Sequence, residues 1–495
     1  MSDEVEKADS DDFKDIGAAG LTDTISMRDD PDREEPRLEA EKSNYFKFVH
    51  DPWVQIFLIS FISFCNPGMY NALTGMGGSG QVDGTVAANS NVATHACTAG
   101  SALILVGVFY KYIGPRLSLL IGGWTYALYS GSLLNYNRTG NGAFVIAAGA
   151  ILGLGAAFFW VAQGTIMVTY SNDQTRGRAI GLFWIVFNLG GAIGSLASFG
   201  INYKSKKGTV TDSTYVAYTV IMLFGWALSI FVSPAGSLNQ RYKGYREKEI
   251  SKLTWKSFKV TARQSLRILL DWRVVCLYPM FYNANVFYSY QQNVVNGATF
   301  NLRTRSLNSA LYWIAQMLGG FLIGFILDFS LIGNRRNRAL WGWGTLFVTG
   351  MVIWGGGYNF QVWSDERKAQ GIVQTIDYKD GTIYVGPMFL YFFYGLYDSF
   401  WQGFCYWIIG SLSRAPAINA VIVGSYSALK PAGGAMAWRI NAQAVSPMKQ
   451  FAMNWGLTIG CLLVALPAVW ALPKTETEAI IHEEGFETTD DTVSA

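Results

Sequence analysis

Phe64-Cys-Asn-Pro-Gly-Met-Tyr-Asn71 lies inside the first long apolar run of the chain. Proline lacks a backbone donor and glycine loosens the turn, so this segment predicts a helix that is bent or opened. In hydrocarbon, the freed backbone groups and the side chains of Asn66, Tyr70 and Asn71 are tolerated only where they face protein or a wet cavity. The segment therefore predicts an interrupted membrane helix with a polar face. The simpler alternative is that Pro67 only shapes helix packing.

The same pattern returns in the second half of the chain. Pro279-Met-Phe-Tyr282-Asn283 repeats the order Pro-x-x-Tyr-Asn at an offset of 212 residues from Pro67. An interrupted polar helix that occurs once in each half predicts a duplicated membrane transporter with its site between the halves.

The composition agrees with a membrane protein. The chain has 495 residues, of which 51% are hydrophobic, 15% aromatic and only 15% charged, a mix typical of membrane helices and their interfacial belts. The charges are unevenly spread, because residues 1–50 hold 15 acidic and 7 basic side chains and residues 474–495 hold 7 acidic and 1 basic. We expect disordered acidic tails at 1–52 and 473–495, and a basic centre that lies against an anionic leaflet.

Apolar runs long enough to cross about 30 Å of hydrocarbon occur six times on each side of a basic segment at 235–271. The predicted spans are 54–75, 92–112, 116–135, 143–170, 178–201, 214–234, 272–295, 306–327, 339–358, 387–411, 415–437 and 448–472. We therefore predict an all-α membrane protein with 12 transmembrane helices in two six-helix bundles, residues 53–234 and 272–472, joined by a basic linker.

The distribution of lysine and arginine predicts the orientation. With an even number of spans both tails lie on one side, and that side carries 18 basic loop residues against 10 on the other. This bias places both tails in the cytoplasm, in the plasma membrane or an endomembrane. Asn137-Arg-Thr139 is then an external glycosylation sequon. The five cysteines all lie in apolar runs without a Cys-x-x-Cys pair, so we expect buried thiols.

Two loop segments and two tryptophan segments support a repeat and a family. The second span ends Gly107-x-x-x-Lys111-x-x-Gly114-Pro-Arg116 and the eighth ends Gly324-x-x-x-Asp328, which resembles the loop signature of the major facilitator superfamily. The run from Asn66 to Gln81, together with Trp160-x-x-Gln163-Gly164 and Asp398-x-x-Trp401-Gln402, resembles the "uncoordinated ninety-three"-like branch, especially its fungal members. This resemblance covers about residues 50–472 and implies a central cavity lined by spans one, four, seven and ten. Lys111 departs from the usual acidic loop residue, which Asp328 retains.

Three ionisable side chains are candidates for proton or ion coupling. Asp398 lies near the middle of span ten and Lys430 in the outer half of span eleven, where charges are costly unless they pair or face water. Because the two spans run in opposite directions, these residues lie at similar depths. They form either a pair that responds to protons or substrate, or a fixed ion pair between two helices. His95 is either a proton relay or a hydrogen-bond partner of a neighbouring helix.

Amides, phenols and indoles in the spans are candidates for solute binding. They can hydrogen-bond a neutral or zwitterionic organic solute without burying a net charge, although helix-to-helix hydrogen bonds would use the same groups. If the repeat holds, Gln163 faces Gln402 across the cavity. Trp160 and Trp401 either cap a ligand or, as is more common for a membrane tryptophan, pack against other helices or lie at the membrane interface. The candidates are Asn66, Tyr70, Asn71, Trp160, Gln163, Tyr282, Asn283, Asn285, Tyr288, Trp401 and Gln402.

The sequence favours transport over enzymatic activity. It has no catalytic set, metal motif or cofactor motif, and Met76-Gly-Gly-Ser-Gly80 lacks the context of a phosphate loop, so we interpret it as a flexible outer gate. We predict a secondary transporter that moves a small solute by alternating access, with proton coupling as an option. The alternative is a non-transporting regulatory or trafficking subunit of an ion channel or receptor, a role known in animal members of the branch it resembles. The expected partners are the lipid bilayer, a solute and such a channel or receptor, and no nucleic acid.

Overall fold

A computed structural model of the chain shows helices throughout the part it describes. The described residues are 48–81, 84–102, 107–170, 176–204, 209–233, 263, 265–329, 332–372, 374–412 and 416–472. Both predicted acidic tails and most of the predicted basic linker lie outside these residues. All helices below belong to one compact unit, Val49–Ala495.

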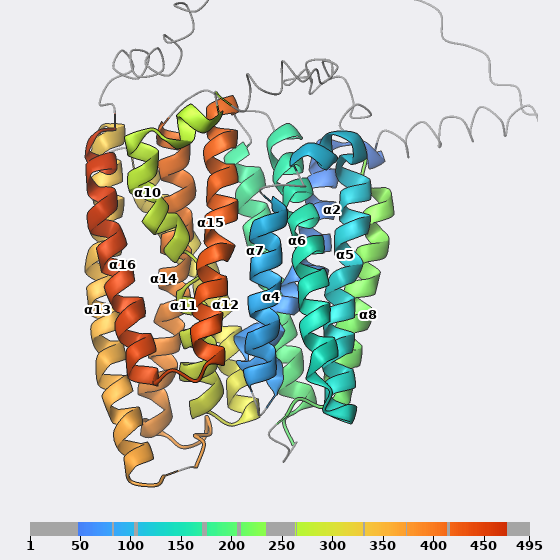
Figure 1. Ribbon diagram of the computed structural model, residues 1–495, viewed down its shortest axis with the longest axis vertical. Helices are drawn as coiled ribbons and strands as arrows, with labels where there is room; N and C mark the ends of the chain where they lie inside the picture. The colour runs from blue at the N-terminus through green and yellow to red at the C-terminus, as the bar shows by residue number, and fades with distance from the viewer. Residues whose placement is uncertain are drawn as a thin grey trace, which may run out of the picture. The chain divides into compact units, whose positions relative to one another are not determined.

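The first half of the chain forms one group of helices, blue to green in Figure 1. It comprises α2 (Pro52–Ser63), η1 (Phe64–Gly68), α3 (Met69–Gly75), η2 (Gly78–Gly80), α4 (Gly84–Ser101), α5 (Gly107–Thr139), α6 (Gly142–Thr169), α7 (Arg176–Ile201), α8 (Asp212–Leu228) and η4 (Ser229–Phe231).

The second half forms the other group, yellow-green to red in Figure 1. It comprises α10 (Trp272–Asn283), α11 (Phe287–Ser289), η7 (Tyr290–Gly297), α12 (Leu302–Asp328), α13 (Arg335–Ala369), α14 (Thr382–Leu412), α15 (Pro416–Ala442) and α16 (Pro447–Trp470). When short helices that follow one another are joined into spans, the described residues trace twelve crossings in two six-helix bundles, as predicted.

The predicted interruptions are present in both bundles, in different forms. Phe64–Gly68 is a π-helical turn with Pro67 inside it, between the α-helical segments α2 and α3. In the second half Pro279 lies within α10, and the helix opens only afterwards, at residues 284–286 and in the π-helix η7. A π-helical turn accommodates the missing proline donor and is frequently found at functional sites.

Six of the described helices are long and apolar enough to span a membrane by composition alone. The other spans carry more polar or charged side chains. α14, for example, contains several tyrosines and Asp398, and α15 contains Lys430. Asp398 and the tyrosines Tyr391, Tyr394 and Tyr397 are buried inside the second bundle, which keeps them away from lipid.

Equivalent backbone anchors confirm the internal repeat. Asp51 caps α2 and Asp271 caps α10, each by accepting backbone N–H bonds at the start of the first helix of its bundle. At the same end of the molecule, which we call the tail side, Arg116 donates to the Val232 carbonyl over 2.7 Å. In the second bundle Arg336 donates to the Leu472 carbonyl over 2.9 Å. In both cases an arginine at the start of the third span holds the end of the sixth.

Gly114 divides α5 into the end of the second span and the start of the third. Its φ of 72° lies in the left-handed region, and a Cβ placed there would have no neighbour within 4 Å. The glycine is therefore required by the backbone turn and not by a lack of space.

Gly114→Ala is expected to lower the free energy of unfolding by about 1–2 kcal/mol, the cost of left-handed backbone for an L-residue. Gly324→Ala is the matched control, because Gly324 also has open space around its Cβ position but lies in the regular helix α12. Thermal unfolding in detergent compares the two variants. Equal effects of both would contradict the assigned role of the backbone turn.

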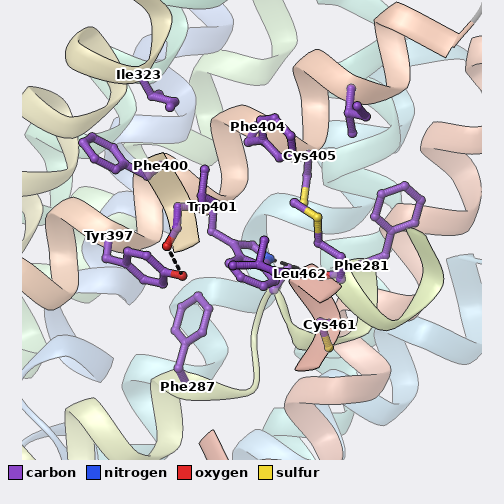
Figure 2. Packing of buried hydrophobic residues seen from close by; sticks show 14 of the residues in the cluster. Phe281, Phe287, Ile323, Tyr397, Phe400, Trp401, Phe404, Cys405, Cys461 and Leu462 are labelled. Carbon is purple, nitrogen blue, oxygen red and sulfur yellow. Dashed lines mark hydrogen bonds between the residues drawn. The ribbon is translucent and has the colours of Figure 1, made fainter. Parts of the chain in front are cut away.

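Each bundle has its own buried core. Aromatic and aliphatic side chains pack inside the second bundle around Trp401, which Figure 2 shows surrounded by Phe281, Phe287, Phe400 and Leu462. The bundles contact one another mainly through α4 against α15 and α7 against α12. The candidate residues of α4 and α15 therefore lie where the two halves meet.

Candidate functional site

Asp398 is the centre of a hydrogen-bond network inside the second bundle. The residue is 1% exposed. Its Oδ2 accepts hydrogen bonds from the hydroxyls of Tyr288 (2.6 Å) and Tyr312 (3.4 Å) and from the amide of Gln316. Its Oδ1 accepts one from Gln402 over 3.3 Å. Both oxygens of the carboxylate therefore receive hydrogen bonds, and all of the donors are neutral side chains.

The network joins four of the spans. Tyr312 is shared, because its hydroxyl also lies 2.9 Å from Gln291 Oε1 in η7. Gln402 donates to the Ala284 carbonyl over 2.8 Å, and its Oε1 accepts the Tyr426 hydroxyl of α15. The interrupted seventh span thus supplies both backbone and side-chain partners to α14. A change at Asp398 is coupled to α10–η7, α12 and α15.

Lys430 is not paired directly with Asp398. Among the described residues no Lys430–Asp398 contact lies within 4.0 Å, and Lys430 Nζ lies 5.4 Å from the centroid of the Tyr426 ring. The lysine is close enough to Asp398 and His95 for their charges to interact. The side chain is only partly buried. The fixed ion pair considered from the sequence is therefore absent from this conformation.

His95, Asn285 and Gly434 lie together at the junction of the bundles. A Cβ at Gly434 would lie 3.3 Å from His95 Cγ and Nδ1 and 3.3 Å from Asn285 Cβ. His95 comes from α4, Asn285 from the opening between α10 and α11, and Gly434 from α15 one turn after Lys430. The structure therefore brings residues from distant parts of the chain to one point.

The candidates of the first span have partners within their own bundle. Asn66 donates to the Ile62 carbonyl over 3.1 Å, while its buried Oδ1 has no partner among the described residues. Tyr70 donates to Asn91 Oδ1 over 2.8 Å and so joins the first span to α4. Asn71 is partly buried and its side chain makes no hydrogen bond in the described part of the chain.

The fourth-span candidates differ from one another. Trp160 packs edge-on against Phe159 and Phe187, with ring centroids 5.9 and 5.5 Å away. Gln163, one turn later on α6, is partly buried and has no hydrogen-bond partner among the residues described. Gln163 is therefore the more available of the two for a ligand.

In the seventh span the candidates point to different neighbours. Asn283 donates to Thr458 Oγ1 of α16 over 3.1 Å, which is the helix-to-helix role that the sequence left open. Tyr282 is partly buried, and its backbone carbonyl oxygen lies close to the position that a Cβ on Gly433 would take. Tyr288 belongs to the Asp398 network.

Two candidates on α14 have partners within their own bundle. Trp401 is fully buried and donates to the Met280 carbonyl over 3.1 Å, so in this conformation it packs in the core of its bundle, the alternative that the sequence left open (Figure 2). Gln402 uses both ends of its amide within the same bundle, so it does not reach across to Gln163. Helix rotation, which the sequence pattern does not give, decides both outcomes.

The loop signatures are described only in part. Gly107 begins α5 and Asp328 ends α12, but the side chains of Lys111 and Asp328 lie outside the described set. Arg116 donates to the Val232 carbonyl at the tail side. A Cβ at Gly324 would have no neighbour within 4 Å.

The side chain of the sequon residue Asn137 makes hydrogen bonds within the folded protein. Asn137 Nδ2 donates to the Val210 carbonyl over 2.9 Å and lies 3.2 Å from Asp212 Oδ1. Its Oδ1 accepts Gln81 Nε2 over 2.9 Å. A sugar on Nδ2 would have to displace these contacts, so the structure offers a second role for this asparagine and glycosylation stays a prediction.

Asn137→Ala is therefore expected to lower the free energy of unfolding by about 1–3 kcal/mol, because it leaves buried polar partners unsatisfied. Its electrophoretic mobility is expected to equal that of the wild type. Thr139→Ala, which destroys the sequon but removes only exposed contacts of Thr139, is the control. A glycosidase-sensitive mobility shift that both substitutions remove would contradict this prediction.

Several residues of the site belong to no motif that predicts them from the sequence. Tyr312 and Gln316 lie one helical turn apart on α12, Tyr426 lies one turn before Lys430, and Arg305 lies at the start of α12. The signal that was available is the polar spacing of four residues within an apolar span. Such a spacing marks one face of a helix but does not say which neighbour it meets.

The bundles are sealed together at the end opposite the tail side, which we call the far side. Arg305 is 5% exposed and its guanidinium donates to the carbonyls of Met76 (2.7 Å), Gly77 and Gln81 (3.4 Å). Asn293 Oδ1 accepts the Gly78 amide over 2.7 Å. The segment predicted to be a gate is therefore held by the second bundle.

Close packing and further hydrogen bonds continue this seal. Gly77 has a φ of 74°, and a Cβ there would lie 2.2 Å from the Gln292 carbonyl. Tyr391 and Asn296 both donate to the Gly75 carbonyl, over 2.8 and 2.9 Å, and Ser195 lies 2.8 Å from Ser309. The glycines of the segment let two backbones approach closely.

The fold defined by these helices is that of the major facilitator transporters. Over 87% of the chain it is similar to the xylose transporter XylE from E. coli in a partially occluded inward-open conformation, with a TM-score of 0.56, 13% identity and 98% of that structure covered. It is also similar to a bacterial homologue of the human drug peptide transporters PepT1 and PepT2, with a TM-score of 0.53, 11% identity, and 88% and 100% of the two chains covered.

Sequence comparison gives the family. Residues 91–350 match the family model described as ion channel regulatory protein UNC-93. UNC93-like protein 1 from Arabidopsis thaliana is 40% identical over 439 residues, which cover 86% of this chain and 94% of the plant protein. An UNC93-like protein from Schizosaccharomyces pombe is 38% identical over 483 residues, covering 97% and 93%. The chain belongs to the UNC-93 family, which confirms the resemblance inferred from its motifs.

Proposed function

We propose that this multi-pass membrane protein is a secondary transporter that moves a small solute by alternating access between its two bundles. The observation that carries the proposal is the buried Asp398, whose hydrogen-bond donors are all neutral side chains. A carboxylate deep in a membrane protein is costly and marks a functional site by default. A purely structural role would be served as well by an apolar residue.

Protonation of Asp398 supplies a mechanism for coupling. The protonated carboxyl becomes a donor on one oxygen, so it can no longer accept every hydrogen bond that it receives as a carboxylate. The donors from Tyr288 and Gln316 then have to turn toward other acceptors. Because Gln316 lies on α12, which packs against α7, the change reaches a helix that contacts the first bundle.

The far-side contacts support a conformation closed at that end. With both tails in the cytoplasm, as the distribution of basic residues favours, the far side is the external one and this conformation faces inward. Transport then requires Arg305 to release the carbonyls of residues 76–81 so that the site opens outward. Alternating access is the release and re-formation of this seal.

Reconstituted full-length protein in liposomes tests this function. A proton gradient is imposed across the membrane and uptake of a broad mixture of small organic solutes is followed by mass spectrometry. We expect gradient-dependent accumulation of at least one solute. Accumulation equal to that of protein-free liposomes for every solute would refute transport.

The family description favours a second candidate, a regulatory subunit of an ion channel. An apolar groove of about 460 Å³ between α13 and α16, lined by residues that include Met351, Phe451, Trp455 and Gly456, could seat a transmembrane helix of such a partner. Gly456→Trp fills this groove. Loss of channel current without loss of solute uptake would favour the regulatory function for this surface.

A further inference from the structure

His95, Asn285 and Lys430 come from three elements and share one feature. None of the three side chains has a hydrogen-bond partner among the described residues, although all lie where α4, α15 and the opening after α10 meet. None of the three is among the buried polar atoms without a partner, so their polar groups face open space where a ligand can supply the missing hydrogen bonds.

Gly434 keeps space between these side chains. A Cβ at this position would approach both His95 and Asn285 to 3.3 Å, tighter than ordinary van der Waals contact. Asn285 is 8% exposed, and His95 and Lys430 are partly exposed, so their polar atoms remain accessible despite the surrounding helices. The unsatisfied groups can therefore be reached by a ligand.

The charge at this point is positive and uncompensated by direct contact. Asp398 accepts hydrogen bonds from neutral groups on both of its oxygens, and among the described residues it forms no ion pair with Lys430 within 4.0 Å. The Lys430 ammonium has three donors, and its Nζ lies 5.4 Å from the centroid of the Tyr426 ring. The Asn285 amide adds two more donors and the His95 imidazole at least one.

We propose that these three residues bind the carboxylate of an organic anion, which is the transported solute. The proposal rests on the transport function proposed above and names its substrate class. A carboxylate accepts charge-assisted hydrogen bonds from the ammonium and neutral ones from the amide and imidazole. This assigns Lys430 to solute binding and leaves coupling to Asp398.

The adjoining surface suits an apolar body on this anion. Tyr426 stacks edge-on with Tyr406 at 5.2 Å, and Tyr406 lies 6.3 Å from Trp184 of the first bundle. Tyr406 is 41% exposed. The aromatic series therefore extends from Lys430 toward α7, and because Tyr426 is fully buried, Tyr406 offers the face for the hydrocarbon part of the solute. It also places that solute in contact with both bundles, as alternating access requires.

The test compares solutes that differ only in charge. Liposomes containing the full-length chain receive an equimolar mixture of organic carboxylates, the corresponding amides and the corresponding amines, including phenylacetate, phenylacetamide and phenethylamine. We expect carboxylates to accumulate and the amides and amines to remain at background. Preferential accumulation of amides or amines would overturn the anion assignment while leaving transport intact, whereas no accumulation of any solute would overturn the transport function itself.

Lys430→Gln tests whether the preference for carboxylates depends on the lysine. Carboxylate uptake is expected to fall by about tenfold or more, as for loss of hydrogen bonds from a charged donor, and Lys430→Arg is expected to restore part of it. Excess inorganic phosphate and chloride are added separately as competitors. Complete competition by either would replace the organic anion with an inorganic one and overturn the proposal.

A fold control accompanies this variant. Because Lys430 makes no described hydrogen bond, the unfolding midpoint of Lys430→Gln without ligand is expected to match that of the wild type. The transported carboxylates are expected to raise the midpoint of the wild type only. Gly434→Ala, which narrows the site from the other side, is expected to raise KM for the carboxylate. Unchanged uptake in both variants would overturn the proposed site.

Discussion

Asp398→Asn is expected to reduce solute uptake to the level of protein-free liposomes while the protein still reaches the membrane. The substitution removes the titratable group and replaces one acceptor oxygen with a donor. With the amide oxygen at the Oδ2 position, the Gln402 donor would face the NH₂ group, and in the other orientation the donors from Tyr288 and Gln316 would face it. We expect a loss of about 1–3 kcal/mol in the free energy of unfolding as well.

Asp365→Asn is the matched control for this prediction. It makes the same chemical change at the far end of α13, where Asp365 accepts a hydrogen bond from Gln361 over 2.9 Å. Uptake by this variant is expected to equal that of the wild type. Uptake assays in liposomes and thermal unfolding measure the two effects separately. Gradient-driven uptake by Asp398→Asn at the wild-type rate would exclude Asp398 from coupling.

Arg305→Met is expected to open the far side. It leaves the carbonyls of Met76, Gly77 and Gln81 without their donor, and each buried acceptor left unpaired costs about 1–3 kcal/mol. In a background without native cysteines, Ser195→Cys reports opening, because Ser195 is buried and contacts Ser309 across the bundle interface. Its labelling by a membrane-impermeant maleimide from the far side is expected to rise about tenfold. This rise corresponds to a decrease of about 1.4 kcal/mol in the free energy of opening.

Arg303 provides the control, two residues earlier on the same helix. Its ion pair with Asp377, at 2.5 Å, lies near the surface, and such pairs contribute about 0–1 kcal/mol. Burial raises the pKa of Asp377, but hydrogen bonds led by that from Asn301 outweigh it, so the pKa lies below its usual value. Arg303→Gln is expected to leave the labelling of Ser195→Cys nearly unchanged. Equal labelling of the Arg303 and Arg305 variants would show that Arg305 does not hold the seal.

The sequence was most informative at residues whose charge or missing backbone donor costs free energy within the hydrocarbon. Asp398 and Lys430 stand out because a charge in an apolar run needs a reason, and Pro67 predicts an interrupted helix because it lacks a donor. Tyr312 and Gln316 were not recognised, since one phenol and one amide in a long apolar helix have many harmless partners. Their role depends on which face of α12 meets α14.

The same limit explains the outcomes at Trp401 and Gln402. The repeat predicted Gln402 opposite Gln163 and left Trp401 either capping a ligand or packing, but a repeat in the sequence does not give the rotation of a helix. Asn137 lies in a valid sequon, but its use as a hydrogen-bonding partner of the segment at Val210 depends on a contact over 73 residues. Short patterns contain no information about such contacts.

The amino-acid sequence by itself determined the twelve apolar spans, the duplication, the interrupted first and seventh helices and the family, because each follows from local composition or a short motif. Only the tertiary structure decided that Asp398 is satisfied by neutral donors, that Lys430 is left without a direct partner beside His95 and Asn285, and that Arg305 closes the far side. These outcomes depend on the rotation and packing of helices that are distant in the chain. Hydrophobicity specifies that a helix crosses the membrane, whereas close packing against its neighbours specifies what each of its side chains meets.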